Sequence, residues 1–350
     1  MHLQSLASAF PPGSYTQAEC WQIIRDSSAA KALRGRSLKL LEKILLGDSG
    51  IERRHFCVSD PSQVFSQDAE SLNREFVFHA PKLGGEALTK ALSRAEIKAT
   101  DLDAIFVCTC TGYICPGITS HIAEQLGMRP DAYLQDLVGL GCGAAIPTLR
   151  SAEGFLSANP DATVAVIAVE VCSAAFYIDD NPGVLISLCL FGDGASASIW
   201  RQNPSPAAAG GAIYRASNFK TVHKPDQREK IRFVNAGGKL KNQLHRSVPE
   251  VAAEAVSELF SAGPDPDKID RILTHTGGRD VIDALESRLP VDSLTESREV
   301  LRDYGNLSSP SVLIALERHL ASENPAENLW LTAFGAGFAC HSMELSRESL

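Results

Sequence analysis

The sequence predicts an α/β fold made of two similar halves in which strands and helices alternate. Runs rich in valine and isoleucine, such as residues 162–170, are typical of strands buried on both faces. Segments with apolar residues at helical spacing lie between such runs in both parts of the chain. Residues 201–211, rich in proline, alanine and glycine, form the clearest linker, and they divide the chain into halves at 1–200 and 212–350.

In the first half, residues up to about 60 are expected to form a helical preface, and residues from 84 to 92 belong to a helix. Residues 103–110 predict a buried strand, followed by a turn at 111–117 and a helix at 118–126. A further helix is expected after Cys142, because apolar residues recur at helical spacing from Ile146 to Phe155.

The second half repeats the alternation without repeating the sequence itself. A helix is expected at about 248–260, a short strand before His275, and helices reaching about 289 and covering about 308–321. Strands are expected at 329–334 and 339–345. With 350 residues, 44% hydrophobic and 21% charged, the chain can bury a core in each half.

Cys142 is the strongest candidate nucleophile. It lies among glycines and alanines just before an expected helix, where a sharp turn allows a substrate close to the backbone. Free N–H groups and the positive end of the helix dipole favour the thiolate at such a position. The alternative is a small cysteine packed between a strand and a helix.

His275 and Asn306 are the candidate partners of this thiol. His275 ends a short apolar strand before a glycine pair, and Asn306 follows Gly305 just before another helix. Either residue alone is typical of local hydrogen bonding in a turn. Together with Cys142 they make a plausible set of nucleophile, base and amide donor.

Composition excludes several classes of function. The net charge of −9 argues against general nucleic-acid binding, and no stretch has the roughly 18 apolar residues of a membrane span. The start lacks a signal peptide, and nine cysteines without framework spacing suit reduced thiols in a cytoplasmic enzyme. Cys108, Cys110 and Cys115 have a spacing that suggests a metal site, but no further ligand completes it, so no metal is expected.

Four sequence blocks resemble the signature blocks of type III polyketide synthases, the chalcone synthase-like family. They are Gly141-Cys142, Leu190-Phe191-Gly192-Asp193-Gly194-Ala195, His275-Thr276-Gly277-Gly278 and Gly305-Asn306-Leu307-Ser308-Ser309. The blocks have the family's order and spacing, and the resemblance runs from about Leu6 to about Leu345. It implies a thiolase-like fold with the active site between the halves, a homodimer, acyl-CoA and malonyl-CoA as substrates, and no further cofactor.

The resemblance also implies roles for individual residues. Cys142 would carry the acyl group, with His275 and Asn306 as hydrogen-bond donors. Phe191 would be a gatekeeper between a coenzyme A tunnel and the cavity, although an ordinary core phenylalanine is the alternative. The residues implied to line the cavity are Cys110, Thr111, Cys172, Ala175 and Ser308. The loop with Cys115 would reach across the dimer interface; small residues filling a strand end and a turn are the structural alternative for Cys110, Thr111 and Cys115.

The helical preface contains the candidate binding patch for coenzyme A. Arg36, Lys39 and Lys43 share one helix face, and by resemblance this region holds the phosphates. The alternative is the solvated face of an amphipathic helix. Asp48 and apolar residues stand where some of the family's basic residues align. The chain also departs from the family at Asn242, where plant members place a second gate phenylalanine, and at 334–338, which lacks the usual proline.

The resemblance implies repeated decarboxylative condensation with malonyl-CoA on an acylated Cys142, and then cyclisation. Small cavity residues favour an aliphatic starter and a pyrone or resorcinol-type product. The alternative is a synthase that uses malonyl-CoA alone and makes a polyhydroxylated aromatic. Outside this reaction, the open alternatives are a priming ketoacyl synthase that uses acyl carrier protein, a papain-like protease and a non-catalytic relative.

Overall fold

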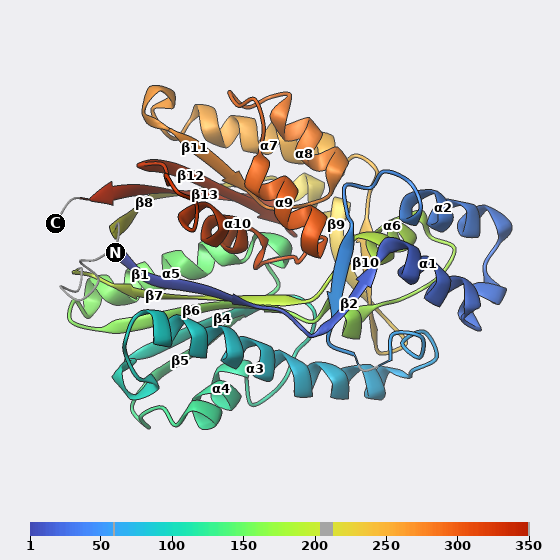
Figure 1. Cartoon of the computed structure of the whole chain (residues 1–350), viewed down its shortest axis with the longest axis horizontal. Helices are drawn as coiled ribbons and strands as arrows, with labels where there is room; N and C mark the ends of the chain where they lie inside the picture. The colour runs from blue at the N-terminus through green and yellow to red at the C-terminus, as the bar shows by residue number, and fades with distance from the viewer. Residues whose placement is uncertain (59, 204–212, 349–350) are drawn as a thin grey trace.

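The computed structural model describes residues 1–58, 60–203 and 213–348. In these residues helices and strands stack in five layers, with one pair of helices between two layers of strands and further helices outside (Figure 1). The strands nevertheless form one nine-stranded sheet, in the order β11-β12-β13-β8-β1-β7-β6-β4-β5. The two βα halves are therefore joined in one sheet, through the pairing of β1 with β8.

The strands of the first half lie around a fully buried β6 (Thr163–Glu170). The others are β1 (His2–Ala9), β4 (Ala104–Thr109), β5 (Tyr133–Val138) and β7 (Gly194–Arg201). The predicted strands at 103–110 and 162–170 are confirmed. The prediction of an all-helical preface is wrong for its first residues, because β1 pairs with β7 along almost its whole length.

The strands of the second half are β8 (Ile213–His223), β11 (Arg271–Thr274), β12 (Asn328–Gly335) and β13 (Ala339–Glu348). Strand β1 joins the halves, since its His2 and Leu3 pair with Arg215 and Tyr214 of β8. The predicted strands before His275, at 329–334 and at 339–345 are confirmed. The predicted linker lies, from residue 204 on, outside the described residues.

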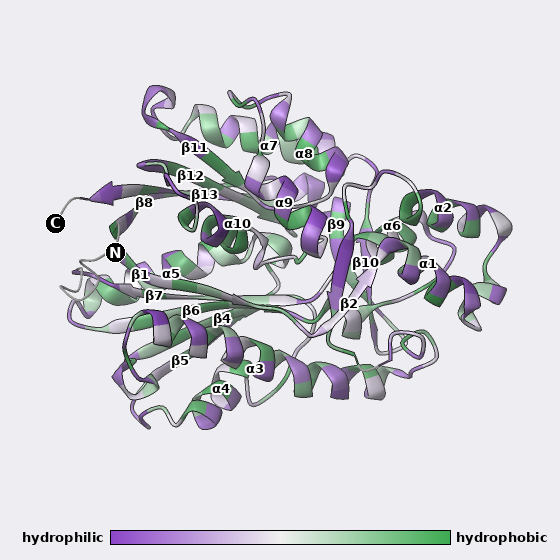
Figure 2. Cartoon of the chain, viewed as in Figure 1, coloured by the Kyte–Doolittle hydropathy of each residue, from purple (hydrophilic) through white to green (hydrophobic). Residues whose placement is uncertain are grey.

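The central helices, α5 (Ala145–Ala158) and α10 (Ser311–Leu320), pack between the two layers of strands. The largest apolar cluster is built there, from α5, α10 and the strand faces toward them. The outer helices of the first half are α3 (Ala69–Arg94) and α4 (Ile118–Leu126). Those of the second half are α7 (Val248–Ser261), α8 (Arg279–Glu286) and α9 (Thr295–Tyr304). On the outer helices Figure 2 shows hydrophobic and hydrophilic residues side by side, as expected for surface helices.

A smaller group of elements covers one end of the sheet, at the right of Figure 1. It contains the helices α1 (Gln17–Asp26), α2 (Gly35–Leu45) and α6 (Pro182–Leu190), the strand pair β2 (Gly13–Thr16) and β3 (Arg53–Phe56), and the hairpin of β9 (Ile231–Ala236) and β10 (Lys239–Leu244). Single-turn helices complete the described chain: Ala29–Ala32, Ala99–Asp101, Gly141–Gly143, Cys172–Ala175, Pro225–Lys230 and Pro266–Lys268. None of the described helices is both long and apolar enough to cross a membrane.

Candidate functional site

Cys142 lies on a tight turn between β5 and α5, in the single-turn helix Gly141–Gly143. The turn presses against the end of β12 from the other half. A Cβ at Gly335 would lie 2.6 Å from the backbone nitrogen of Gly143 and 2.9 Å from that of Cys142. Gly141 has φ +61°, a conformation that glycine adopts without strain. Glycines therefore let the two halves touch at the candidate nucleophile.

Ser308 is the residue at which the three candidate catalytic residues converge. Its hydroxyl donates to Cys142 Sγ at 3.3 Å, and its backbone N–H donates to Asn306 Oδ1 at 2.8 Å. Its backbone also lies close enough to the His275 imidazole to influence the pKa of that group. The sequence-predicted Cys142, His275 and Asn306 thus come together from three separate segments.

The fold buries His275 and Asn306 behind the nucleophile. His275 directly follows β11, its N–H donates to the Thr332 carbonyl at 2.9 Å, and its ring lies edge-on to Phe334 with centroids 5.2 Å apart. Asn306 pairs with Phe191 in a β-bridge, and its Nδ2 donates to the Gly277 carbonyl at 3.4 Å. His275 is 1% and Asn306 2% exposed. His275 Nδ1 has no hydrogen-bond partner among the described residues.

Burial favours the neutral forms of Cys142 and His275. It raises the pKa of the Cys142 thiol to about 12, although the hydrogen bond from Ser308 acts to lower it. Burial lowers the pKa of the His275 imidazole to about 3. The sequence led us to expect a helix terminus that stabilises a thiolate, but desolvation outweighs this effect. Charge separation between these groups therefore requires a proton to pass from one to the other.

Glu170, which the sequence did not single out as a site residue, lies directly behind Ser308. It is fully buried at the end of β6 and accepts hydrogen bonds from Ser308 Oγ at 3.2 Å and Ser309 Oγ at 2.6 Å. Its other oxygen accepts from the hydroxyl groups of Thr109 and Thr111 and from the backbone N–H groups of Cys110 and Thr111. The only sign of it in the sequence is a single acidic residue at the end of an otherwise uncharged strand. Glu170 holds together the turns that flank the nucleophile.

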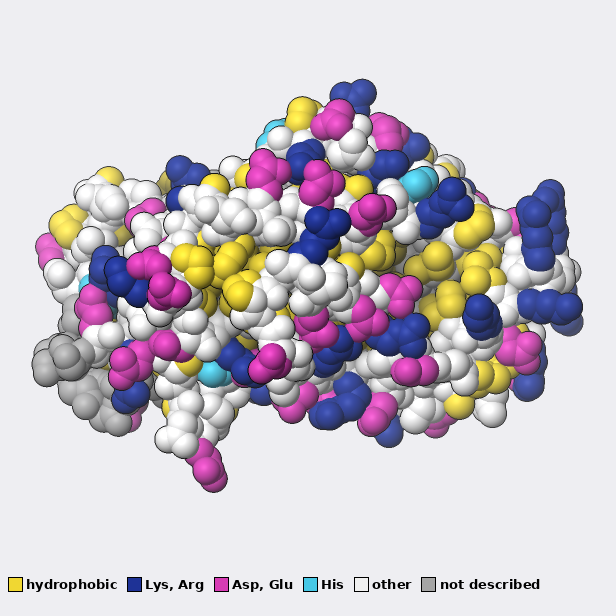
Figure 3. Space-filling model, turned by 90° about the horizontal axis from the view of Figure 1, so that it is seen from above, with side chains coloured by type: hydrophobic (Ala, Val, Ile, Leu, Met, Phe, Trp, Pro, Cys, Tyr) yellow, Lys and Arg dark blue, Asp and Glu magenta, His cyan; other side chains and the backbone are white. Residues whose placement is uncertain are grey.

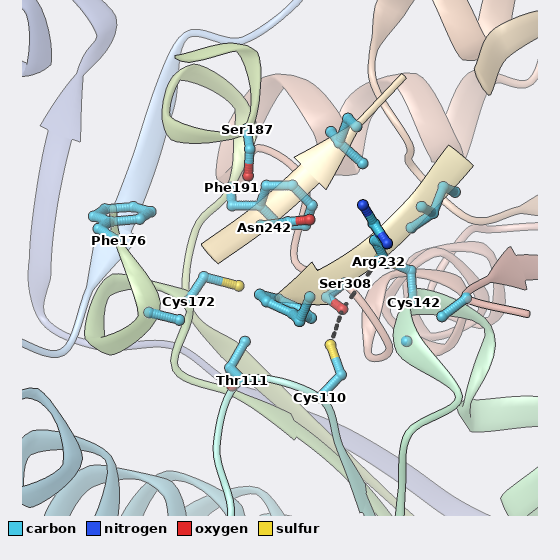
Figure 4. A pocket seen from close by; sticks show the side chains of 16 residues that line it. Cys110, Thr111, Cys142, Cys172, Phe176, Ser187, Phe191, Arg232, Asn242 and Ser308 are labelled. Carbon is cyan, nitrogen blue, oxygen red and sulfur yellow. Dashed lines mark hydrogen bonds between the residues drawn. The ribbon is translucent and has the colours of Figure 1, made fainter. Parts of the chain in front are cut away.

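A narrow pocket opens in front of Cys142 (Figure 4). Its space is about 30 Å³, which is room for about two water molecules. Each residue implied by resemblance to line the cavity lies in its wall: Cys110, Thr111, Cys172, Ala175, Ser308 and the gatekeeper candidate Phe191. The loop residue Cys115 is not in this wall but is exposed.

The outer wall of the pocket is the β9–β10 hairpin, which the sequence analysis did not predict. Ile231, Phe233, Asn242 and Leu244 lie on its pocket-facing side, because residues directly opposite in an antiparallel pair share a face. Arg232 also borders the pocket, but its side chain pairs with Gln243 and Glu229 on the other side of the hairpin. The inner surface is therefore mostly apolar, with a polar residue at Asn242.

A second, larger pocket adjoins the first. It has a volume of about 570 Å³ and shares Leu244 with the narrow pocket. Its wall also contains Leu190, which precedes Phe191, and Gly277, which lies two residues after His275. The larger pocket thus adjoins the narrow one, which contains Cys142.

Basic residues surround the larger pocket, but only one of the three predicted from the helical preface is among them. Lys43 lies in its wall, whereas Arg36 and Lys39 are exposed elsewhere on α2. Arg246 and Arg279, from the second half, lie in the wall instead. Arg279 forms ion pairs with Asp48 and Asp280, at 3.2 Å each, while Arg246 has no ion-pair partner among the described residues. Figure 3 shows basic side chains gathered at the end of the molecule that α1 and α2 form.

The described residues contain no group of three or more His, Cys, Asp or Glu side chains placed to hold a metal ion. All nine cysteines carry free thiols. Three of these thiols, those of Cys110, Cys142 and Cys172, lie in the wall of the narrow pocket, and Ser308 Oγ lies within hydrogen-bond distance of Cys110 and Cys142.

Residues 7–262 match the family described as FAE1/type III polyketide synthase-like protein. Residues 259–346 match the C-terminal family of 3-oxoacyl-[acyl-carrier-protein] synthase III. A 1,3,6,8-tetrahydroxynaphthalene synthase from Streptomyces peucetius subsp. caesius is 29% identical, over 95% of this chain and 89% of its own. A 3,5-dihydroxyphenylacetyl-CoA synthase from Streptomyces toyocaensis is 31% identical, over 83% of this chain and 78% of its own.

Solved structures show the same architecture. The crystal structure of 1,3,6,8-tetrahydroxynaphthalene synthase from Streptomyces coelicolor A3(2), a bacterial type III polyketide synthase, superposes with a TM-score of 0.87, at 25% identity and with full coverage of both chains. PKS-I from the brown alga Ectocarpus siliculosus has a TM-score of 0.88 at 22% identity, covering 99% of this chain and 98% of its own. These likenesses confirm the predicted thiolase-like α/β fold.

Proposed function

Because this chain belongs to the FAE1/type III polyketide synthase-like family, we propose that it condenses malonyl units on Cys142 by decarboxylative Claisen chemistry. The observation that carries the proposal is the convergence of Cys142, His275 and Asn306 on Ser308, at the wall of the narrow pocket. The thiol of Cys142 faces this pocket, and the larger pocket adjoins it at Leu244. Such a reaction needs a nucleophile, a base and donors for an oxyanion, and these residues supply all three.

Loading begins with attack of Cys142 sulfur on the thioester carbonyl of an acyl-CoA. His275 takes the thiol proton as the C–S bond forms, so that neither buried group carries an isolated charge. The tetrahedral intermediate then collapses, the bond to the coenzyme A sulfur breaks, and His275 returns the proton to that leaving thiolate. The acyl group remains on Cys142.

Extension begins when malonyl-CoA loses carbon dioxide. The electron pair of the breaking C–C bond becomes an enolate, whose thioester oxygen accepts hydrogen bonds from His275 and Asn306. The enolate carbon attacks the Cys142 thioester, the new C–C bond forms, and Cys142 leaves. Removing one oxyanion donor in a well-studied hydrolase costs about 2.7–4 kcal/mol, so each donor here should matter strongly. The apolar ring of Phe191 disfavours the ionised malonyl carboxylate beside it.

The similarity to the curated relatives supports a malonyl starter over the aliphatic chain that the sequence favoured. The space of about 30 Å³ in front of Cys142 is smaller than an aliphatic chain and a polyketide chain alike, so the choice of starter rests on these relatives. The names of both curated relatives describe products or groups with hydroxylated aromatic rings. We therefore adopt the alternative that malonyl-CoA supplies starter and extender and that the product is a polyhydroxylated aromatic.

The larger pocket is the proposed site for coenzyme A. Lys43 and Arg246 carry positive charges on its wall without an ion pair among the described residues, and Arg279 adds a third cation. Such groups suit phosphates, which bind guanidinium groups by paired hydrogen bonds. Arg246 and Arg279 take this role in place of Arg36 and Lys39, which are exposed and do not line the pocket.

A homodimer is proposed on the strength of strand β5. It lies at the edge of the nine-stranded sheet and exposes 48% of Tyr133 and 51% of Val138. Tyr113, in the Cys115 loop, is 70% exposed. An apolar edge strand of this kind calls for a partner. Nine free thiols suit a reducing compartment such as the cytoplasm.

The C-terminal match supports one second candidate, a condensing enzyme that takes its substrate from acyl carrier protein. Parallel assays with malonyl-CoA and with malonyl-acyl carrier protein separate the two functions. Turnover of the carrier-bound substrate alone would establish the second candidate.

The proposal is tested by incubating the purified protein with isotopically labelled malonyl-CoA, alone and with aliphatic acyl-CoA starters, and determining product masses. We expect labelled product from malonyl-CoA alone, and none from the Cys142→Ala variant. Products that always contain the aliphatic starter would restore the pyrone or resorcinol alternative. Absence of any product with every thioester would refute the proposed function.

A further inference from the structure

The wall of the narrow pocket contains two polar side chains that form no hydrogen bond with another described residue. Asn242, on β10, faces the pocket on the otherwise apolar side of the hairpin, directly opposite Phe233. Ser187, on α6, is 7% exposed and also lies in the wall. Neither side chain forms a hydrogen bond to another described residue, while the neighbouring Gln243 does.

The backbone fixes these two groups on the same pocket. The hairpin turns through Gly237 and Gly238, both at positive φ (+59° and +79°), so its register is set by a tight two-residue turn. A slip by one residue would turn Asn242 outward, so its inward direction belongs to the fold. Helix α6 begins against the end of β10, where a Cβ at Gly183 would lie only 2.3 Å from the Leu244 carbonyl oxygen.

The residues around Asn242 and Ser187 indicate which kind of ligand fits the pocket. Near these two groups the wall is aromatic or aliphatic, while the other polar residues, Thr111 and Ser308, already form hydrogen bonds, and Figure 4 shows Asn242 and Ser187 near Phe191 at the side away from Cys110. A ligand that fills the pocket and offers no acceptor covers the half-buried Asn242 amide and leaves it unpaired. A ligand with an oxygen at this position recovers that hydrogen bond.

We propose that Asn242, assisted by Ser187, determines specificity by donating hydrogen bonds to keto oxygens of the chain attached to Cys142. This inference rests on the proposed function and names its substrate class: short 3-oxoacyl thioesters derived from malonyl units, rather than aliphatic acyl groups of the same length. The amide N–H and the hydroxyl are both donors, and ketone and enolate oxygens are acceptors.

The test compares two thioesters that differ at one carbon: acetoacetyl-CoA, with a ketone at C3, and butyryl-CoA, with a methylene. Transfer of either acyl group to Cys142 releases coenzyme A and is followed by intact-protein mass spectrometry. The ratio of the two rate constants is measured in the wild type, in Asn242→Leu, in Ser187→Ala and, as a matched control, in Gln243→Leu. Comparing ratios between variants cancels the intrinsic reactivity of each thioester.

We expect Asn242→Leu to lower the ratio of acetoacetyl to butyryl transfer by about tenfold, because one hydrogen bond contributes about 0.5–1.5 kcal/mol. Ser187→Ala should lower it less, and Gln243→Leu should leave it unchanged, because Gln243 faces away from the pocket. An unchanged ratio in Asn242→Leu, with both esters still acylating Cys142, would refute the inference and leave the proposed function intact. Failure of every thioester to acylate Cys142 would refute both.

Discussion

At the scale of single residues, the account depends on a thiol and an imidazole that are each difficult to charge alone. Burial raises the pKa of Cys142 to about 12 and lowers the pKa of His275 to about 3. The pair is therefore neutral over most of the pH range between these two values. The fraction of Cys142 present as thiolate is small and rises about tenfold per pH unit toward the pKa of about 12.

Alkylation of Cys142 by iodoacetamide in the wild type should accordingly accelerate about tenfold per pH unit between about pH 5 and pH 9, because the thiolate forms by losing its proton toward the pKa of about 12. His275→Ala should show the same slope, because the neutral imidazole holds no charge that would stabilise the thiolate. Peptide mapping separates Cys142 from the exposed Cys115. A rate that is constant over this range in the wild type and becomes steep only in His275→Ala would show that the two groups form an ion pair instead.

Glu170 is expected to act on stability through its hydrogen bonds. Glu170→Ala leaves the buried donors of Ser309 and Thr111 without an acceptor, at about 1–3 kcal/mol for each unsatisfied group, so the free energy of unfolding should fall by roughly 3 kcal/mol or more. Glu170→Gln keeps one acceptor oxygen and should cost less. Urea denaturation measures both. Equal stability of Glu170→Ala and the wild type would contradict this positioning role.

At the scale of elements, α2 and the segment after β10 compete for the role of phosphate binder. The pocket wall contains Lys43 of α2 and Arg246, which follows β10, but neither Arg36 nor Lys39. Of the three basic residues predicted on this face of α2, only Lys43 lies in the pocket wall. Arg36 and Lys39 belong to the solvent-exposed face of the helix.

Arg246→Ala should raise the KM for malonyl-CoA about tenfold and leave kcat nearly unchanged, because a phosphate contact is made equally in the ground and transition states. Arg36→Ala is the matched control, an exposed arginine on the same end of the molecule, and should change KM less than twofold. Steady-state kinetics of both variants decide the assignment. The reverse pattern would return the phosphate site to α2.

At the scale of the whole molecule, the five-layer arrangement explains which features were predictable. The alternation of buried strands and amphipathic helices is local, so β4, β6, α4, α5 and α7 follow from short windows of sequence. Strand β1 does not, because His2–Ala9 mixes polar and small residues and becomes a strand only between β7 and β8. Partners far away in the chain decide its structure.

The same reasoning applies to the site. Cys142, His275 and Asn306 were identifiable because each lies in a short block with glycine. Glu170, Arg246 and the β9–β10 wall were not, because their importance arises from residues that approach from distant segments. Ser308 meets Glu170 across 138 positions of sequence. No local pattern records such a contact.

Assembly is a further property of the whole molecule. Val138→Lys places a charge on the exposed apolar edge of β5 and should convert the proposed dimer to monomer, because burying an unpaired ammonium group is costly. Multi-angle light scattering at micromolar concentration measures the change in mass. Gln135→Lys is the control, because it adds the same charge to β5 at a position that is already polar, and it should disturb the dimer less. A wild-type protein that is monomeric and fully active would contradict the proposed dimer.

The central claim is that Cys142 carries the chain during decarboxylative condensation. Its most direct test is to mix the enzyme with malonyl-CoA labelled at the free carboxylate, and to follow label release as carbon dioxide together with the mass of the Cys142 peptide. The account predicts that carbon dioxide release and an acyl adduct on Cys142 appear together, and that Asn306→Ala slows the release by about a hundredfold or more. Carbon dioxide released at the wild-type rate by Asn306→Ala, or an adduct on any other cysteine, would contradict it.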